Sequence, residues 1–204
     1  YYLFYALTII LLPAVSQATT QNNTVETENL VNKSLRLLTL LLFPIITLLI
    51  VYAVETLNLF YGASYKEAVN PMSIFALGVG FLTVFYVLSF ALNGAGLVKI
   101  PMKLTFFGLL AMIALNFILI PPFKLIGAAL STTIVSFALM IGILVYTELH
   151  FNVRLHFKTI ALSLISVFII VFLARFLPHG FYSFTLSGAV LFFFYFALLK
   201  IFGE

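Results

Sequence analysis

The sequence contains no cysteine and no aspartate, and charged residues of either sign make up only 8% of it. Without cysteine the chain has neither disulfide bonds nor cysteine-ligated metal sites, and thiol usage says nothing about its compartment. The absence of aspartate removes much of the carboxylate chemistry available to hydrolases and metal-dependent enzymes. Soluble domains carry about 25% charged residues, so a soluble protein of this size would lack the charge to cover its surface.

Hydrophobic residues make up 64% of the chain, against the ~45–50% usual for soluble domains. Two uncharged runs, Leu104–Ile120 and Ala128–Tyr146, are each close to the roughly 20 residues that cross a bilayer as a helix. The short segment between them begins with Pro121 and Pro122, which cannot continue the first helix. The sequence therefore predicts an all-α polytopic membrane protein with an antiparallel transmembrane hairpin at its centre.

Seven hydrophobic segments are predicted in all: the two runs of the hairpin and five others. These five are Tyr1–Val15, which is shorter than a full span, Leu37–Phe60, 72–92, Thr159–Ala174 and Phe184–Phe202. The first lacks the basic start of a signal peptide, so we interpret it as a helix cut at its outer end. Pro44 predicts a kink in the second of them. Asn23 followed by Glu26 predicts a capped helix start, which opens an interfacial helix leading into that span.

The basic residues between these segments predict the topology, because cytoplasmic loops of membrane proteins are enriched in lysine and arginine. One side holds Lys33, Arg36, Lys99, Lys103, Arg154, Lys158 and Lys200, and the other holds Lys66, Lys124 and Arg175. This asymmetry places the loops of the first group and the C-terminus in the cytoplasm. We expect a multi-pass protein of the plasma membrane.

Four polar residues within the spans are candidates for function. Glu55 is the only acid predicted inside a span, so it is either an ion-coupling group or a solvated residue at the outer interface. Asn116 either bonds a neighbouring helix or contacts substrate. Ser131 and Thr132, with Thr133 and Ser136 beside them, either face a polar lumen or bond the carbonyls of their own helix.

Lys99, Lys103, Arg36 and Arg154 form a predicted basic rim on the cytoplasmic side. They either bind an anionic substrate or serve only as topology signals that contact anionic lipid. The stretch that contains Gly94 and Gly96 lacks the Gly-Lys-Ser/Thr ending of a phosphate loop. It is better explained as a helix end. His150 and His156 lack a helical ligand spacing. No metal, cofactor or nucleic-acid partner is therefore predicted.

Three short stretches carry a resemblance to a known family. They are Asn116–Pro121 with Gly127–Ser136 behind it, Leu12–Ser16 with its Pro-x-Ser, and Phe60–Ala68 with its Gly-x-x-Tyr-x-x-Ala. Together they resemble the polysaccharide-biosynthesis flippases, the Wzx-type exporters of lipid-linked oligosaccharides. This family belongs to the multidrug/oligosaccharidyl-lipid/polysaccharide exporter superfamily.

The resemblance implies the C-terminal half of a two-lobed transporter that works by alternating access. Residues 1–146 would be the second lobe, incomplete at its start, and residues 147–204 two additional helices. The implied partners are membrane lipids, a missing N-terminal lobe of the same polypeptide, and a polyprenyl-(pyro)phosphate-linked sugar or oligosaccharide as the substrate to be flipped. The resemblance implies no enzymatic activity.

Two alternatives remain at this point. A multidrug or cation antiporter of the same superfamily would need a buried carboxylate, and only Glu55 is available. An integral membrane glycosyl- or acyltransferase would need acid/base or metal-binding residues near the membrane surface. The absence of aspartate and cysteine argues against the enzyme.

Overall fold

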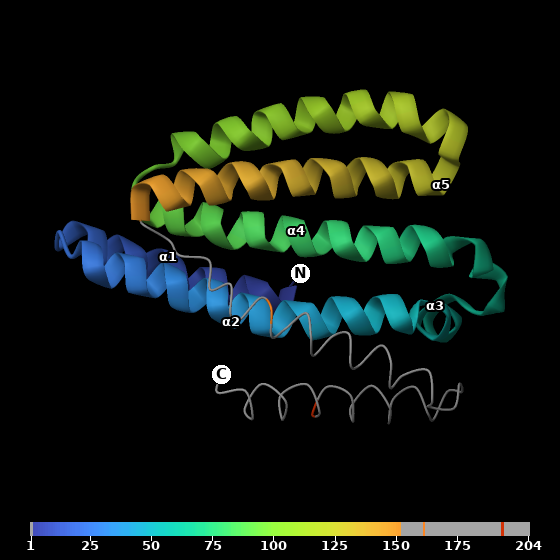
Figure 1. Ribbon diagram of the computed structural model, residues 1–204, viewed down its shortest axis with the longest axis horizontal. Coiled ribbons are helices and arrows are strands. Elements are labelled where there is room, and N and C mark those ends of the chain that lie inside the picture. The colour runs from blue at the N-terminus through green and yellow to red at the C-terminus, as the bar shows by residue number, and fades with distance from the viewer. Residues whose placement is uncertain (1, 152–160, 162–192, 194–204) are drawn as a thin grey trace. The chain divides into compact units, whose positions relative to one another are not determined.

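The computed structural model describes residues 2–151 and the single positions 161 and 193. The elements of residues 2–151 are all helices, which confirms the all-α class. They are α1 (Tyr2–Thr20), α2 (Thr24–Val51), α3 (Ala53–Tyr61), the 3-10 helix η1 (Ala63–Ala68), α4 (Val69–Gly94) and α5 (Lys99–Phe151) (Figure 1). The described residues 2–38 and 77–151 belong to one compact unit, and residues 39–76 to a second. The predicted spans Thr159–Ala174 and Phe184–Phe202 lie, apart from positions 161 and 193, outside the described residues.

A tight turn joins α1 to α2. Asn22 adopts a left-handed φ of 54°, its N–H donates to Thr19 O at 3.0 Å, and the Asn23 N–H donates to Ala18 O at 3.0 Å. These two bonds form a Schellman motif, which satisfies carbonyls at the helix end. Asn23 then caps α2, because its Oδ1 accepts the Glu26 N–H at 3.1 Å and its Nδ2 donates to Glu26 Oε2 at 2.9 Å. The predicted start of this helix is confirmed.

The predicted end of the first helix was wrong. Helix α1 continues past Val15 to Thr20, so Pro13 lies inside it rather than at its end. The side chains of Thr19 and Thr20 donate to the carbonyls of Val15 and Gln17 at 2.8 Å. Polar residues in this stretch therefore stay within the helix, and the link to α2 is much shorter than the polar composition indicated.

Helices α1 and α2 bury matching positions at helical spacing. The buried residues are Thr8, Leu11, Val15 and Ala18 on α1 and Thr27, Val31, Leu35 and Leu38 on α2. Two helices joined by so short a turn run antiparallel as neighbours. In such a hairpin Val15 lies level with Val31, and Leu11 with Leu35.

The predicted interfacial helix and the span after it form one continuous helix, α2. The reason is that the apolar edge of the polar segment, at Val31 and Leu35, is in phase with the buried Leu38 and Leu42 of the span. The predicted span Leu37–Phe60 is nevertheless divided. Its helix breaks at Tyr52, where φ is −105° and ψ is 33°, while Pro44 lies inside α2.

The link between α4 and α5 is also shorter than the predicted 93–103 and consists of residues 95–98. Gly96 takes a φ of 80°, its N–H donates to Asn93 O at 3.0 Å, and the Leu97 N–H donates to Leu92 O at 2.9 Å. This second Schellman motif confirms that the glycine-containing stretch closes a helix. Lys99 is then the first residue of α5.

Helix α5 folds back on itself at Lys124, where φ is 50° and ψ is −123° (Figure 1). We call residues 99–123 its first arm and residues 125–151 its second arm. A Cβ atom on Gly127 would lie 2.1 Å from the Leu119 carbonyl oxygen, and one on Gly108 would lie 2.9 Å from Leu139 Cδ2. These contacts confirm the predicted antiparallel hairpin. Pro121 and Pro122 lie in the last turn of the first arm instead of beyond it.

The second arm also packs on α4. A Cβ atom on Gly78 would lie 2.7 Å from Thr133 Oγ1 and 3.0 Å from Thr133 Cα. One turn further along both helices, the rings of Phe81 and Phe137 are 5.1 Å apart. Because the residue numbers of these contacts increase along both helices, α4 and the second arm run parallel. The second arm therefore lies between α4 and the first arm, as Figure 1 shows.

Candidate functional site

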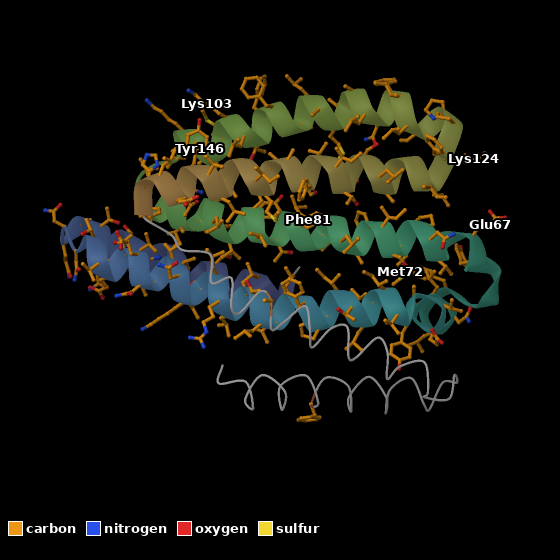
Figure 2. The ribbon with its side chains drawn as sticks, viewed as in Figure 1. Glu67, Met72, Phe81, Lys103, Lys124 and Tyr146 are labelled. Carbon is orange, nitrogen blue, oxygen red and sulfur yellow. The ribbon has the colours of Figure 1, made fainter. Side chains whose placement is uncertain are left out.

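The two basic residues Lys99 and Lys103 lie one helical turn apart at the start of the first arm, and both are exposed. Residues four apart share one face of a helix, so the structure brings these two ammonium groups to one side of α5. Figure 2 shows Lys103 at the same end of the α5 hairpin as Tyr146, and Lys124 at the opposite end, where the helix folds back. The pair therefore lies at the open end of the hairpin, where the first arm begins and the second arm ends.

The other two members of the predicted basic rim are less defined. Arg36 lies on α2 and is half-buried, with an interaction partner within the structure. Arg154 lies outside the described residues. A joint cation cluster of Arg36 and Arg154 with the α5 lysines therefore stays a prediction.

Asn116 lies on the first arm and is half-buried. One turn before it, the sulfur of Met112 lies 4.0 Å from Thr132 Oγ1 on the second arm. Because residues four apart share a helix face, Asn116 is on the side of the first arm that meets the second. The structure thus brings Asn116 and Thr132 to neighbouring levels of the same hairpin.

The hydroxyl groups of the second arm donate to their own helix. Ser131 Oγ donates to Gly127 O at 2.8 Å, and Thr132 Oγ1 to Ala128 O at 3.0 Å. Thr133 Oγ1 likewise donates to Ala129 O at 2.8 Å. Ser131 is 0% exposed. Of the two predicted possibilities, bonding to the helix's own carbonyls is the arrangement that these three side chains adopt.

Glu55 lies in the first turn of α3, just after the break at Tyr52. It is half-buried and has an interaction partner within the structure. The first turn of a helix presents N–H groups and the positive end of the helix dipole, which favour a carboxylate there. The helix start alone therefore accounts for the position of this acid, and a role in ion coupling stays a prediction.

Sequence reasoning missed two asparagines. Asn32 on α2 and Asn93 on α4 each bury a side-chain Oδ1 that has no hydrogen-bond partner within residues 2–151. Their sequence neighbours gave no signal, because Asn32 fell on the polar side of an expected interfacial helix and Asn93 in an expected loop. The signal that could have identified them is a single asparagine within a helix that packs against its neighbours.

A cavity of about 150 Å³ lies beside the α1–α2 turn. Seven of its eight lining residues have polar side chains; the lining comprises Thr19, Asn22, Asn23, Thr24, Thr27, Glu28, His150 and Phe151. His150 Nδ1 lies 2.8 Å from Tyr146 O, so this nitrogen donates to that carbonyl. Within the part of the chain that the structure describes, no three metal-binding side chains come together.

Three comparisons bear on this arrangement. A family model described as "Lipid II flippase MurJ" matches residues 3–199. An uncharacterized membrane protein of Methanocaldococcus jannaschii is 29% identical over 141 residues, which cover 68% of this chain and 32% of that protein. A solved structure of a lipid II flippase MurJ in an inward closed conformation matches with a TM-score of 0.79 at 17% identity, over 98% of this chain. The chain spans 45% of the length of that structure.

Proposed function

This chain belongs to the lipid II flippase MurJ family, and we propose that the protein that carries it flips a lipid-linked sugar precursor across the membrane. The match over residues 3–199 is the observation that carries the proposal. It supports a transporter over an enzyme. The sequence resemblance to lipid-linked flippases is confirmed at the level of this family, and the narrower Wzx type is not what the family model names.

The proposed substrate is a sugar or oligosaccharide attached to a polyprenyl (pyro)phosphate. The family model and the solved structure are both named for a lipid II flippase, which supports this chemical class for the present protein. The proposed class of substrate includes both lipid II and a lipid-linked polysaccharide repeat unit. The sugar would pass a polar lumen by alternating access while the lipid tail stays in the bilayer.

The remaining segments of the transporter are part of the proposal. The chain spans about half of the solved flippase and a third of the archaeal relative, so a further lobe of the same polypeptide would complete the cavity. We place the protein in the plasma membrane with its C-terminus in the cytoplasm, on the strength of the basic asymmetry between loops.

In this proposal Lys99 and Lys103 hold the negative head group of the substrate at the cytoplasmic mouth. Both are exposed and lie on one helix face. Attraction between exposed charges is screened within ~8–10 Å at physiological salt, and each such contact is worth up to about 1 kcal/mol. The two lysines therefore act together, and Arg36 and Arg154 would add to the same field.

The test is flipping of a polyprenyl-pyrophosphate-linked sugar by the full-length polypeptide in liposomes. We expect the double variant Lys99→Gln with Lys103→Gln to slow flipping by roughly twofold to thirtyfold at low salt, since it removes two exposed contacts worth up to about 1 kcal/mol each. The difference in flipping rate between the double variant and the unmodified protein should become smaller as the salt concentration is raised. The matched control is Lys124→Gln at the bend of the α5 hairpin, which should leave the rate unchanged.

Correctly oriented protein is quantified in parallel, because lysine also sets topology. Unchanged flipping at every salt concentration would show that the two lysines serve only as topology signals. Absence of flipping by the unmodified full-length protein, with several lipid-linked sugars, would contradict the flippase function itself.

A further inference from the structure

Two buried amide oxygens have no hydrogen-bond donor among the residues that the structure describes. They are the Oδ1 atoms of Asn32 in α2 and Asn93 in α4. Buried side-chain oxygens in folded proteins nearly always have a partner, and a buried water molecule is a common one. Two orphaned acceptors in one compact unit therefore call for a donor.

The packing places sequence neighbours of the two asparagines at one level of this unit. Val15 and Val31 are both 0% exposed and lie level in the α1–α2 hairpin. A Cβ atom on Gly94 would lie 3.1 Å from Val15 Cβ, so the end of α4 meets α1 at that level. Asn32 directly follows Val31, and Asn93 directly precedes Gly94.

Three nearby hydroxyl groups already donate to other acceptors. Ser89, one turn before Asn93, donates its hydroxyl to Phe85 O at 2.7 Å. Thr19 and Thr27, one turn from Val15 and Val31, donate theirs to Val15 O and Asn23 O. Since these hydroxyls bond their own helices, they do not supply the donor that the two amides lack.

The cavity of about 150 Å³ at the α1–α2 turn provides a source of water. Thr27 and Glu28 line it, and Asn32 lies one helical turn further along α2 from Glu28. Its volume holds several water molecules, since one occupies about 30 Å³ in the liquid. Arg36 lies one turn beyond Asn32, so Glu28 and Arg36 flank it with opposite charges. That balance favours a neutral ligand over a cation.

We propose that Asn32 and Asn93 bind a buried water molecule that bridges α2 to α4, supplied through the cavity at the α1–α2 turn. Water is the smallest molecule that donates two hydrogen bonds, one to each Oδ1 atom. The site would make a hydrated polar contact between α2 and α4.

The direct test is a density map of the full-length protein at a resolution that shows ordered water. We expect a peak within about 2.7–3.2 Å of both oxygens. A map in which one amide donates directly to the other, with no peak between them, would overturn the proposal.

Thermal unfolding of the full-length protein in detergent supplies an independent test. Asn32→Leu and Asn93→Leu should each lower the midpoint, because each leaves the other amide and the water with one partner fewer. The double variant should lower it by less than the two single changes combined, since pairs that share a partner are not additive. Asn29→Leu on α2 and Asn70→Leu on α4 replace exposed amides and serve as matched controls.

Additive losses would show that the two asparagines share no ligand, and losses no larger than those of the controls would show that neither holds one. Both results contradict the proposal. Measurements in sodium, potassium and choline chloride identify the ligand. A midpoint that is the same in all three salts supports water, whereas one that rises with sodium or potassium and loses this dependence in Asn32→Leu would replace water by a cation.

Discussion

Replacing Gly127 by alanine should force the two arms of the α5 hairpin apart. The new methyl group would lie 2.1 Å from the Leu119 carbonyl oxygen and 2.5 Å from the carbonyl carbon, where ordinary contact begins at 3.4 Å. Both are backbone atoms, so no side chain can rotate to make room. The first arm must shift by about 1.3 Å at this level, the difference between the observed and ordinary separations.

The energetic cost follows from two opposing effects. Overpacking costs typically 1–3 kcal/mol and more where backbone must move, while alanine in place of glycine favours a helix by about 1 kcal/mol. We expect a net loss of about 2 kcal/mol. Gly142→Ala is the matched control, because its methyl group would lie 3.0 Å from Leu104 Cδ2, the flexible end of a side chain. Helix propensity should offset that contact.

The assay combines thermal unfolding with disulfide crosslinking, for which the absence of cysteine from these 204 residues is convenient. Met112→Cys with Thr132→Cys places two thiols where side chains touch across the arms. We expect Gly127→Ala to lower both the unfolding midpoint and the crosslinking rate, and Gly142→Ala to leave both near the parent values. Equal behaviour of the two alanine variants would refute the close approach at Gly127.

Three further predictions concern the helix ends, the α4 contact and the topology. Asn23→Ala should destabilise the protein by about 1 kcal/mol in thermal unfolding, because it removes the cap of α2, while Asn29→Ala should change it little. Gly78→Val should destabilise it by about 2 kcal/mol or more, since its Cβ meets the Thr133 backbone; stability equal to the parent would contradict the packing of α4 on the second arm. Single cysteines at Asn22 and Lys124 should react with an impermeant thiol reagent from opposite sides of the membrane, and labelling from the same side would rule out the topology.

The features that could be predicted from the sequence are those with a local cause. Proline at 121 and 122 and the short link that they begin predicted the hairpin, because proline cannot continue a helix and so short a link makes the next run turn straight back. Asn23 and Glu26 predicted the start of α2 through a local capping interaction. The errors at helix ends have a common cause: polar residues such as Thr19 and Thr20 bond their own helix carbonyls, so a polar stretch did not mean a loop.

The features that could not be predicted depend on packing between distant segments. Nothing near Tyr52 in the sequence marks a helix break, whereas Pro44 does and lies inside α2. The burial of Asn32 and Asn93 depends on where α4 meets the α1–α2 hairpin. Sequence periodicity identifies a buried face but does not say which helix covers it.

The order of the helices favours some of the candidate site residues over others. Ser131 lies on the second arm, which packs between α4 and the first arm, and its hydroxyl already bonds Gly127 O. A substrate would reach it only if the helices parted and that bond were broken. Lys99 and Lys103 begin the first arm, whose apolar span is largely exposed in this chain, and both are exposed. Because an anionic head group reaches exposed ammonium groups without any repacking, the lysine pair is the better candidate for the first contact with substrate, and the hydroxyl groups would act only after a conformational change.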